Sequence, residues 1–229
     1  MKTSGTLLLI ILSTLIMALS ACHTQSGSSN LVRGNDIVIE PKEVTEPVTE
    51  PTLKTGDIIF QKSQSKQANA IHEASESEWS HVGILVSKND EWYVAEAIGP
   101  VVATKLEDFI NRGKDKEYKI YRFKYFDSEK MQAALIKAIK KQNKSYDIYF
   151  ELSDDKTYCS ELVYKVMLAV TGHELGHMQQ FKDLKLDGPF VKDLIQRRLT
   201  DQGRELDTEE PIITPISQMQ DPNLTLIKD

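Results

Sequence analysis

The sequence predicts an α+β fold in which helices pack against an antiparallel β-sheet. Short stretches with apolar residues at alternate positions, such as residues 80–87 and 118–124, are typical of half-buried strands. Residues 91–98, an apolar run interrupted by Glu96, are expected to form the return strand, and the turn signal at residues 88–90 lies between it and the strand before. A connection that short joins antiparallel neighbours. Longer stretches with helical spacing, such as residues 128–143, supply the helices.

Each element has its own signal in the sequence. Val82, Ile84 and Val86 face one way on their strand, Ser128 is a candidate helix N-cap, and Gly113 closes a short helix. In chain order we expect a turn and strand at 54–60, a helix at 64–75, strands at 80–87, 91–98 and 101–104, a short helix at 106–112, a strand at 118–124, helices at 128–143, 159–170 and 189–199, and an edge strand at 223–227.

The first 53 residues predict an export signal and a tether. Lys2 is the only charged residue among the first 21, and an apolar run followed by small residues leads to Cys22, as in secretory signals. The segment Leu19-Ser20-Ala21-Cys22 also resembles the bacterial lipobox, in which the cysteine is acylated and becomes the first mature residue. An ordinary signal peptide or a retained membrane anchor is the alternative. We expect a lipoprotein signal peptide at 1–21, a disordered tether rich in Pro, Thr and Glu at 22–53, and one folded domain at 54–229.

The net charge of the chain limits the classes of molecule that it is expected to bind. The formal net charge is −6 at pH 7 and there is no basic stripe, which argues against a nucleic-acid partner. An acidic protein does not bind anionic headgroups by charge, so acylated Cys22 would attach it to the bacterial membrane. Bacterial lipoproteins are sorted according to the residue that follows the acylated cysteine. Here that residue is His23 rather than Asp, which predicts that the protein is held at the outer membrane with its domain facing the periplasm.

Cys159 is the strongest candidate nucleophile. It lies where an apolar helical pattern begins, and the positive end of a helix dipole favours the thiolate form. The only other cysteine is Cys22, for which the lipobox gives a separate role. A disulfide between the two is the alternative in an oxidising compartment, although it would tie a flexible tail to a helix start.

A thiol nucleophile needs a nearby imidazole and a group that orients it. Of the five histidines, His81 lies on a predicted strand, and the next strand carries Glu96 in an apolar context. With a two-residue turn at 89–90, Glu96 lies diagonally from His81; with a turn at 88–89, the two lie directly opposite. Both registers place the two side chains on one face, and Gly83 beside them leaves room for a ring or a substrate. The spacing fits equally a half-buried histidine and a solvated glutamate on an exposed sheet face.

Together these residues resemble the YiiX-like hydrolases, which are permuted papain-fold cysteine hydrolases of the NlpC-type superfamily. The resemblance rests on segments that occur in this order: Leu53-Lys54-x-Gly56-Asp57-Ile58-Ile59-Phe60, Trp79-Ser80-His81-Val82-Gly83-Ile84, Ala95-Glu96-Ala97, Tyr146-Asp147 and Tyr158-Cys159-Ser160-Glu161-Leu162-Val163. It spans about residues 53–199, and in this family the histidine strand precedes the cysteine helix, the reverse of papain's order.

The resemblance implies a cysteine hydrolase that cleaves an amide or ester bond without a cofactor or metal. Cys159 would be the nucleophile, His81 the base and then the acid, and Glu96 the residue that orients the imidazole. The substrate would be a cell-wall peptide or an acyl amide or ester. Tyr158 and Gly83 are candidates for lining the substrate site, although Tyr158 fits a packing role equally well.

Two other functions remain as alternatives. His173-Glu174-Leu175-Gly176-His177 matches H-E-x-x-H, the zinc metalloprotease motif, although Thr171-Gly172 just before it predicts a helix end where the motif needs a helix. A non-catalytic, lipid-tethered binding module is the other alternative, and the loss of Cys159, His81 or Glu96 would have favoured it. His72 is expected at the edge of the core or on the surface.

Overall fold

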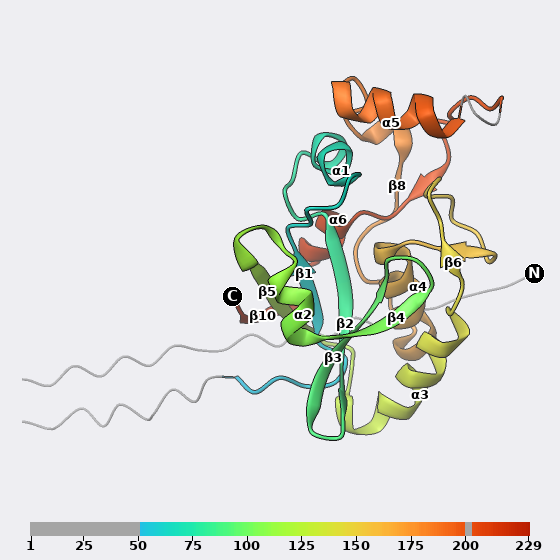
Figure 1. Ribbon diagram of the computed structural model, residues 1–229. Coiled ribbons are helices and arrows are strands. Elements are labelled where there is room, and N and C mark those ends of the chain that lie inside the picture. Colours follow the sequence, from blue (N-terminus) through green and yellow to red (C-terminus); the bar gives the residue numbers. More distant parts are fainter. Residues whose placement is uncertain (1–50, 200–202) are drawn as a thin grey trace, which may run out of the picture. The chain divides into compact units, whose positions relative to one another are not determined.

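The computed structural model describes residues 51–199 and 203–229 (Figure 1). The predicted signal peptide, the predicted lipidation site Cys22 and nearly all of the predicted tether therefore lie outside the described residues. Near the start of the described residues, the Thr52 carbonyl accepts a hydrogen bond from Arg122 at 2.9 Å. No helix in the described ranges is long and apolar enough to cross a membrane.

The centre of the fold is one antiparallel sheet of six strands, as the sequence predicts, in the order β10-β5-β1-β2-β3-β4. Neighbouring strands are mostly close in sequence, and β10 returns from the C-terminus to pair with β5 at one edge. The strands are β1 (Ile58–Gln61), β2 (His81–Lys88), β3 (Glu91–Ala97), β4 (Val101–Lys105), β5 (Tyr118–Phe123) and β10 (Leu224–Lys228).

The β2–β3 hairpin has the first of the two registers considered from the sequence. Lys88 pairs with Glu91, so Asn89 and Asp90 form a two-residue turn. Both turn residues have positive φ, 54° and 61°, which Asn and Asp tolerate better than most residues and which matches the twist of the paired strands. This turn fixes the register of the whole hairpin.

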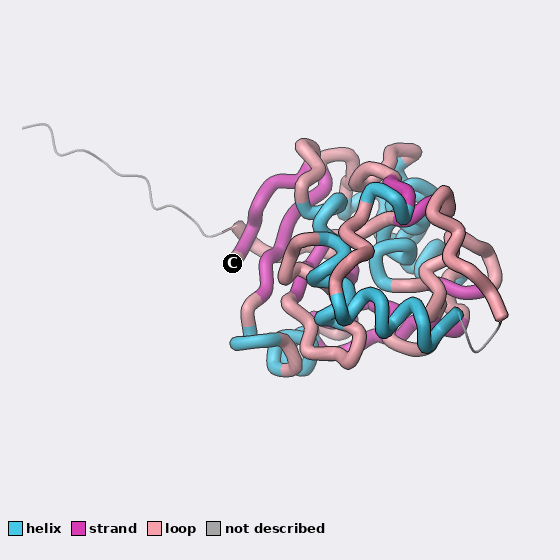
Figure 2. Tube along the Cα trace, turned by 90° about the horizontal axis from the view of Figure 1, so that it is seen from above, coloured by secondary structure: helices cyan, strands magenta, loops and turns pink. Residues whose placement is uncertain are grey.

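Helices cover both faces of the sheet. On one face, α3 (Ser128–Lys141) and α4 (Cys159–Thr171) pack on Val82, Ile84 and Val86 through an apolar cluster that includes Leu135 and Leu162. On the other face, Phe109 of α2 (Leu106–Asn111) packs in a smaller cluster with strand residues. Viewed from above, most of the long strands lie to one side of the molecule and most helices to the other (Figure 2).

A third apolar cluster lies around the start of α4 and combines residues of this helix, of the loop before it and of the segments that follow it. It includes Tyr158 and Phe181, and α1 (Ala68–Ser75) packs beside it against α5 (Pro189–Leu199). The carboxylate of Glu73 on α1 accepts hydrogen bonds from the backbone N–H groups of Phe190 and Val191 at 2.9 and 3.0 Å. Because these N–H groups belong to the first turn of α5, this contact caps α5 and holds the two helices together.

Some details differ from the sequence predictions. Asp127 caps α3 in place of Ser128, because its carboxylate accepts from the N–H groups of Glu129 and Lys130. Helix α1 begins at Ala68 instead of residue 64, after a turn in which Ser63 accepts from the N–H of residue 65. Elements too short to show a sequence period complete the fold: β6 (Ser145–Tyr146) with β7 (Lys156–Thr157), β8 (Gln179–Gln180) with β9 (Pro211–Ile212), α6 (Pro215–Met219), and 3-10 turns at Lys114–Lys116 and Phe181–Asp183.

Candidate active site

Cys159 is the first residue of α4. The residue before it, Tyr158, has an extended backbone and acts as the N-cap, and its N–H donates to the Glu161 carboxylate at 3.2 Å. The Cys159 thiol is free and 3% exposed. It therefore lies at the positive end of a helix, where the first N–H groups have no partner within the helix.

His81 is the first residue of β2, and it meets Glu96 of β3 through the predicted register. Ile84 pairs with Ala95, so Glu96 lies diagonally from His81 on the same face of the sheet. The imidazole Nε2 is 2.6 Å from Oε2 of Glu96. The ring stacks on Phe109, with centroids 5.7 Å apart and an interplanar angle of 29°. Because Nε2 is engaged by Glu96, Nδ1 is the nitrogen that remains for the Cys159 thiol.

Glu96 is fully buried and held from three sides. Besides His81, it accepts hydrogen bonds from the hydroxyl of Thr104 and from the guanidinium of Arg112. Burial by itself raises the pKa of a carboxyl group, but the hydrogen bonds from His81 and Arg112 outweigh it and hold the pKa of Glu96 at about 2. This carboxylate therefore stays ionised across the physiological pH range and fixes the orientation of the ring.

The thiol and the imidazole stabilise each other's charged forms. Burial lowers the pKa of His81, but hydrogen bonds and charge from Cys159 and Glu96 more than offset it and raise the pKa to about 9. Burial raises the pKa of Cys159, and the hydrogen bond and positive charge of His81 reverse this and lower it. A thiolate–imidazolium pair follows from these opposite shifts, which is the reactive state of a cysteine nucleophile.

Three more residues surround this group, and of these only Tyr146, in the segment Tyr146-Asp147, takes part in the resemblance found from the sequence. Glu96 pairs with Val102 of β4, and Thr104 lies two residues further along on the same face of that strand. The alternation of side chains along the strand could therefore have identified Thr104. Arg112 reaches Glu96 from the end of α2, for which the sequence carries no signal. Tyr146 accepts a hydrogen bond from Gln67 Nε2 at 2.7 Å, and burial together with the charge of Cys159 raises its pKa, so the phenol keeps its proton.

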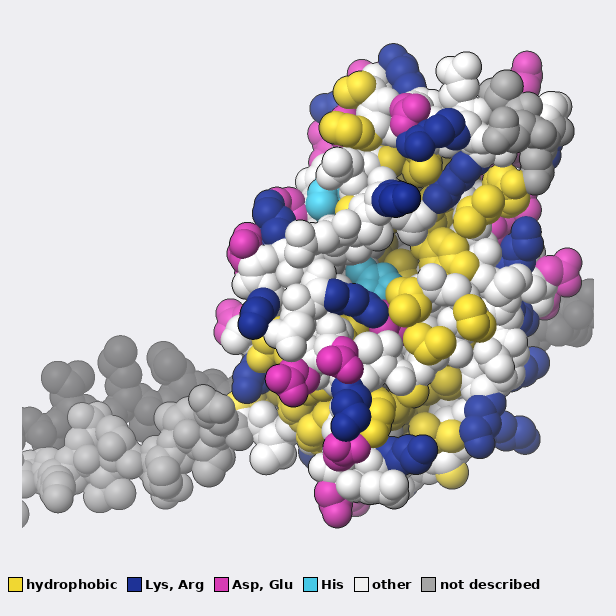
Figure 3. Space-filling view, in the orientation of Figure 1, with side chains coloured by type: hydrophobic (Ala, Val, Ile, Leu, Met, Phe, Trp, Pro, Cys, Tyr) yellow, Lys and Arg dark blue, Asp and Glu magenta, His cyan; other side chains and the backbone are white. Residues whose placement is uncertain are grey.

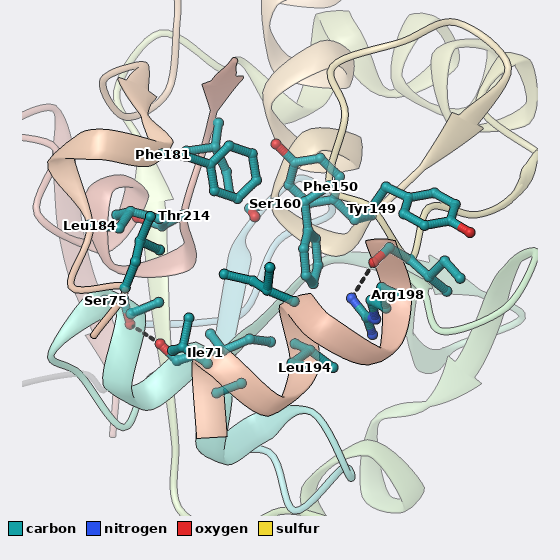
Figure 4. A pocket seen from close by; sticks show the side chains of 18 of the residues that line it. Ile71, Ser75, Tyr149, Phe150, Ser160, Phe181, Leu184, Leu194, Arg198 and Thr214 are labelled. Atoms are coloured by element: carbon teal, nitrogen blue, oxygen red, sulfur yellow. Dashed lines mark hydrogen bonds between the residues drawn. The ribbon is translucent and has the colours of Figure 1, made fainter. Parts of the chain in front are cut away.

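An apolar cavity reaches Cys159 from the side of α1 and α5. It contains about 810 Å³ of space not filled by atoms, part of it open to solvent. The side chains of Phe150, Phe181, Leu184 and Leu194 converge on this space, with Arg198 at one side (Figure 4). The lining residues are Ala70, Ile71, Ala74, Ser75, Ser80, Ile148, Tyr149, Phe150, Tyr158, Cys159, Ser160, Phe181, Leu184, Leu186, Val191, Leu194, Ile195, Arg198, Leu199, Leu206, Ile212, Ile213, Thr214 and Pro215.

The serine and threonine hydroxyl groups in this lining already have hydrogen-bond partners within the protein. Ser75 and Ser160 donate to the carbonyls of residues 71 and 213 at 2.7 and 2.8 Å, and Thr214 donates to the Gln179 side chain at 2.9 Å. Ser80 lies 3.0 Å from His72 Nε2. Arg198 is the one charged residue of the lining, so the remainder of the apolar cavity suits a hydrocarbon chain.

A second, more open cavity meets the site from the side of His81, and we call it the basic groove. It contains about 1490 Å³ of space, including open solvent. Figure 3 shows a histidine side chain in a hollow of this face, with Lys and Arg side chains above and below it. The lining residues are Gln61, Ser63, Gln64, Ser65, Lys66, Gln67, His81, Ala97, Ile98, Arg112, Tyr146, Ile148, Leu194, Arg197 and Arg198.

The two candidate substrate contacts have different surroundings. Tyr158 lines the apolar cavity, although its hydroxyl is engaged, accepting from the Ile213 N–H at 3.1 Å. Gly83 lines neither cavity. A Cβ atom there would lie 2.4 Å from Val94 Cγ1, so Gly83 allows the close approach of β3 rather than leaving room for a substrate.

The H-E-x-x-H segment does not form a helix. Helix α4 ends at Thr171, and Gly172 follows with a φ of 73°, a conformation that ends helices. His173 stacks on Tyr125 with ring centroids 3.7 Å apart, and Glu174 accepts from the Tyr164 hydroxyl at 2.8 Å. The metalloprotease geometry, with both histidines on one helical face, is absent from this segment. His72 is half-buried and bonded to Ser80, as expected for a residue at the edge of the core.

Two proteins of Escherichia coli resemble this chain over most of its length. The uncharacterized protein YiiX of strain K12 is 36% identical over 194 residues, which is 84% of this chain and 95% of that protein. A crystal structure described as metalloprotein yiiX from strain O157:H7 matches with a TM-score of 0.72 and 37% identity, and the match covers 79% of this chain and 99% of that one.

The word metalloprotein applies to that relative. In residues 51–199 and 203–229 of this chain, no group of three or more His, Cys, Asp or Glu side chains comes together in a way that could hold a metal ion. The described side chains therefore do not offer a donor set for a metal, and we assign no chemical step to one.

Residues 52–228 match the family model of the permuted papain-like amidases, YaeF/YiiX, family C92. This match covers the whole sheet and all the helices described above, and the solved relative shares their arrangement. The strand that carries His81 precedes the helix that carries Cys159, as expected for a permuted papain fold. The chain therefore belongs to the permuted papain-like amidase family of YaeF and YiiX and is a papain-like cysteine hydrolase.

Proposed function

We propose that this enzyme removes a fatty-acyl group from an amide or ester, with Cys159 as nucleophile, His81 as base and acid, and Glu96 as the residue that positions the imidazole. The observation that supports this choice of substrate is the apolar cavity that ends at Cys159. Each methylene group buried there would contribute about 0.8 kcal/mol. A cell-wall peptide, whose groups are mostly polar, gains little from such a lining.

The first chemical step forms an acyl-enzyme. The Cys159 thiolate attacks the substrate carbonyl, an S–C bond forms, and the carbonyl oxygen takes up the negative charge. The N–H of Cys159 at the start of α4 is suited to stabilise that oxygen, and the protonated Tyr146 hydroxyl is a second donor nearby. The His81 imidazolium then gives its proton to the leaving nitrogen or oxygen as the C–N or C–O bond breaks.

The second step releases the acyl group as a carboxylic acid. His81, now neutral, takes a proton from a water molecule while the water oxygen attacks the thioester carbonyl. The S–C bond breaks, Cys159 leaves as the thiolate, and His81 is again an imidazolium. Glu96 holds the ring through Nε2 in both steps and stays ionised, because its pKa is about 2.

The enzyme would act at the bacterial membrane. This part of the proposal rests on the lipobox-like segment that ends at Cys22, outside the described residues, and on the prediction of an outer-membrane lipoprotein facing the periplasm. Acylated substrates of low solubility would be available at that surface. Cys22→Ala should release the full-length protein from the membrane fraction. An unchanged distribution and an unchanged intact mass would contradict the anchor.

A chain-length series tests the proposed substrate. We expect kcat/KM for N-acylglycines to rise from acetyl to dodecanoyl by up to roughly fourfold per methylene, since 1.4 kcal/mol corresponds to a factor of ten. Cell-wall peptides from digested peptidoglycan serve as the comparison, measured with the same purified domain. Efficient cleavage of those peptides, with no gain from acetyl to dodecanoyl, would reject the acyl substrate in favour of a cell-wall peptidase.

A further inference from the structure

We propose that the basic groove binds an anionic group on the leaving part of the substrate, with Arg198 as its principal contact. This inference rests on the proposed function, since the apolar cavity must hold the acyl chain for the groove to hold the leaving part. The ligand chemistry is a carboxylate or a phosphate ester close to the bond that is cleaved.

The charges that line the groove are all positive. Lys66, Arg112, Arg197 and Arg198 contribute to its wall, and the lining contains neither Asp nor Glu. The whole chain has a formal net charge of −6, so this concentration of cations beside the nucleophile runs against the overall balance. A cleft lined by one sign of charge raises the local concentration of ligands of the opposite sign.

Two of these cations already have protein partners. Arg112 is bound to the buried carboxylate of Glu96, and Arg197 forms an ion pair with Asp193, four residues earlier on α5. Neither Lys66 nor Arg198 has a carboxylate within ion-pair distance among residues 51–199 and 203–229. Lys66 is exposed, and Arg198 is half-buried.

The Arg198 guanidinium is held in place by neutral groups. It donates to the carbonyl of Ile148 and, at 2.6 Å, to the side-chain oxygen of Gln67, and it lies over the Phe150 ring at 5.2 Å. Burial lowers its pKa, and Asp147 acts on it only from beyond ion-pair distance. A partly desolvated cation without a counter-ion costs free energy that an incoming anion would recover. Its planar fork suits a carboxylate or phosphate.

Arg198 also lies where the two cavities meet. Ile148, Leu194 and Arg198 line both of them, while Cys159 lines the apolar cavity and His81 lines the basic groove. The bond under attack would therefore lie between the two, with the acyl chain on one side and the leaving part on the other. An anion on the leaving part, a few bonds from the scissile bond, would lie beside Arg198.

Matched pairs of substrates test this inference. N-dodecanoylglycine is compared with the neutral N-dodecanoylglycinamide, and 1-dodecanoylglycerol 3-phosphate with neutral 1-dodecanoylglycerol. In at least one of these two pairs, we expect kcat/KM to be at least about tenfold higher for the anionic substrate than for the neutral one. This factor corresponds to the free energy of one charge-assisted hydrogen bond. A larger ratio of anionic to neutral kcat/KM in the glycine pair would identify the preferred anion as a carboxylate, and a larger ratio in the glycerol pair would identify it as a phosphate ester.

Variants assign the preference to one side chain. Arg198→Gln, whose amide can still donate to the Ile148 carbonyl, should bring the ratio close to one, and Arg198→Lys should keep part of it. Lys192→Gln removes one positive charge from the same helix outside both cavities and should leave the ratio as it is. Thermal unfolding of each variant shows whether it remains folded. A ratio near one for both pairs in the unmodified enzyme, or a ratio that Arg198→Gln does not change, overturns the proposal.

A binding measurement separates this inference from the proposed function. Calorimetry on Cys159→Ala compares the Kd of N-dodecanoylglycine with that of N-dodecanoylglycinamide, with and without Arg198→Gln. If the unmodified enzyme hydrolyses no acyl substrate, the proposed function fails, and this binding ratio still decides the anion site. Tighter binding of the anion that depends on Arg198 supports the site, and equal binding refutes it.

Discussion

The two cavities that meet at the candidate site share Ile148, Leu194 and Arg198 but differ in the charge and polarity of the rest of their lining. The apolar cavity lies between α1, α5 and the start of α4, and its serine and threonine hydroxyls are occupied by contacts within the protein. The basic groove is more open, and its wall carries four cations and amide or hydroxyl side chains. Cys159 belongs to the first and His81 to the second. The substrate that we propose, with an apolar acyl part and a polar leaving part, rests on this division.

The largest effect should come from the pair that joins the two cavities. Cys159→Ala and His81→Ala should each lower kcat/KM by at least about a thousandfold, because neither group forms the thioester alone. The double variant should be little worse than either single one, since the two groups act as a unit. Hydrolysis rates on one acyl substrate measure this. Multiplicative losses in the double variant would mean that the two side chains act independently.

The next largest effect should show that the apolar cavity, and not the basic groove, binds the acyl chain. Ala74→Phe places a ring in the apolar cavity and should lower kcat/KM for a dodecanoyl substrate by roughly a hundredfold, the value of about three or four buried methylenes. The acetyl substrate should be hydrolysed nearly as before, because it does not extend that far. Ala133→Phe, on an exposed position of α3 away from both cavities, is the matched control. Equal losses on both substrates would show that the ring disturbs the site itself.

A smaller effect concerns pH. In the proposed mechanism the imidazolium of His81 is the acid of the first step, so we expect activity to fall as pH rises through about 9, the pKa of His81. Glu96 raises that pKa, and Glu96→Gln should therefore move the alkaline limb to lower pH and reduce the maximal rate by roughly ten- to hundredfold. Profiles of kcat/KM against pH for both forms measure the shift. An alkaline limb that stays in place would mean that Glu96 does not act through His81.

The sequence predicted the sheet side of the site better than the cavities. His81 and Glu96 lie on adjacent strands joined by a two-residue turn, so local alternation and turn length placed them on one face. The start of α4 at Cys159 followed from its apolar helical spacing. These signals involve neighbours along the chain, and sequence patterns record such neighbours well.

The cavities depend on contacts between distant segments. Gln67 and Arg198 are hydrogen-bonded although 131 positions separate them, and no period or motif in the chain indicates this. Arg112 reaches Glu96 from the end of a short helix in the same way. The sequence suggests that Gly83 leaves room for a ligand, whereas in the structure it allows the close approach of the neighbouring strand. Tertiary packing decides such cases, and the expected lipid anchor at Cys22 remains a prediction.

The most direct test of a thiolate that faces an apolar cavity is the labelling of Cys159 by two alkyl chloromethyl ketones, methyl and undecyl. The thiolate displaces chloride, and intact mass follows the reaction from pH 5 to 10, below the micelle concentration of the long reagent. The account predicts labelling well below pH 8.5, the usual pKa of a thiol, and at least about a hundredfold faster with the undecyl reagent. The His81→Ala variant should lose the labelling at low pH. Equal rates for both reagents, rising only above pH 8.5, would contradict it.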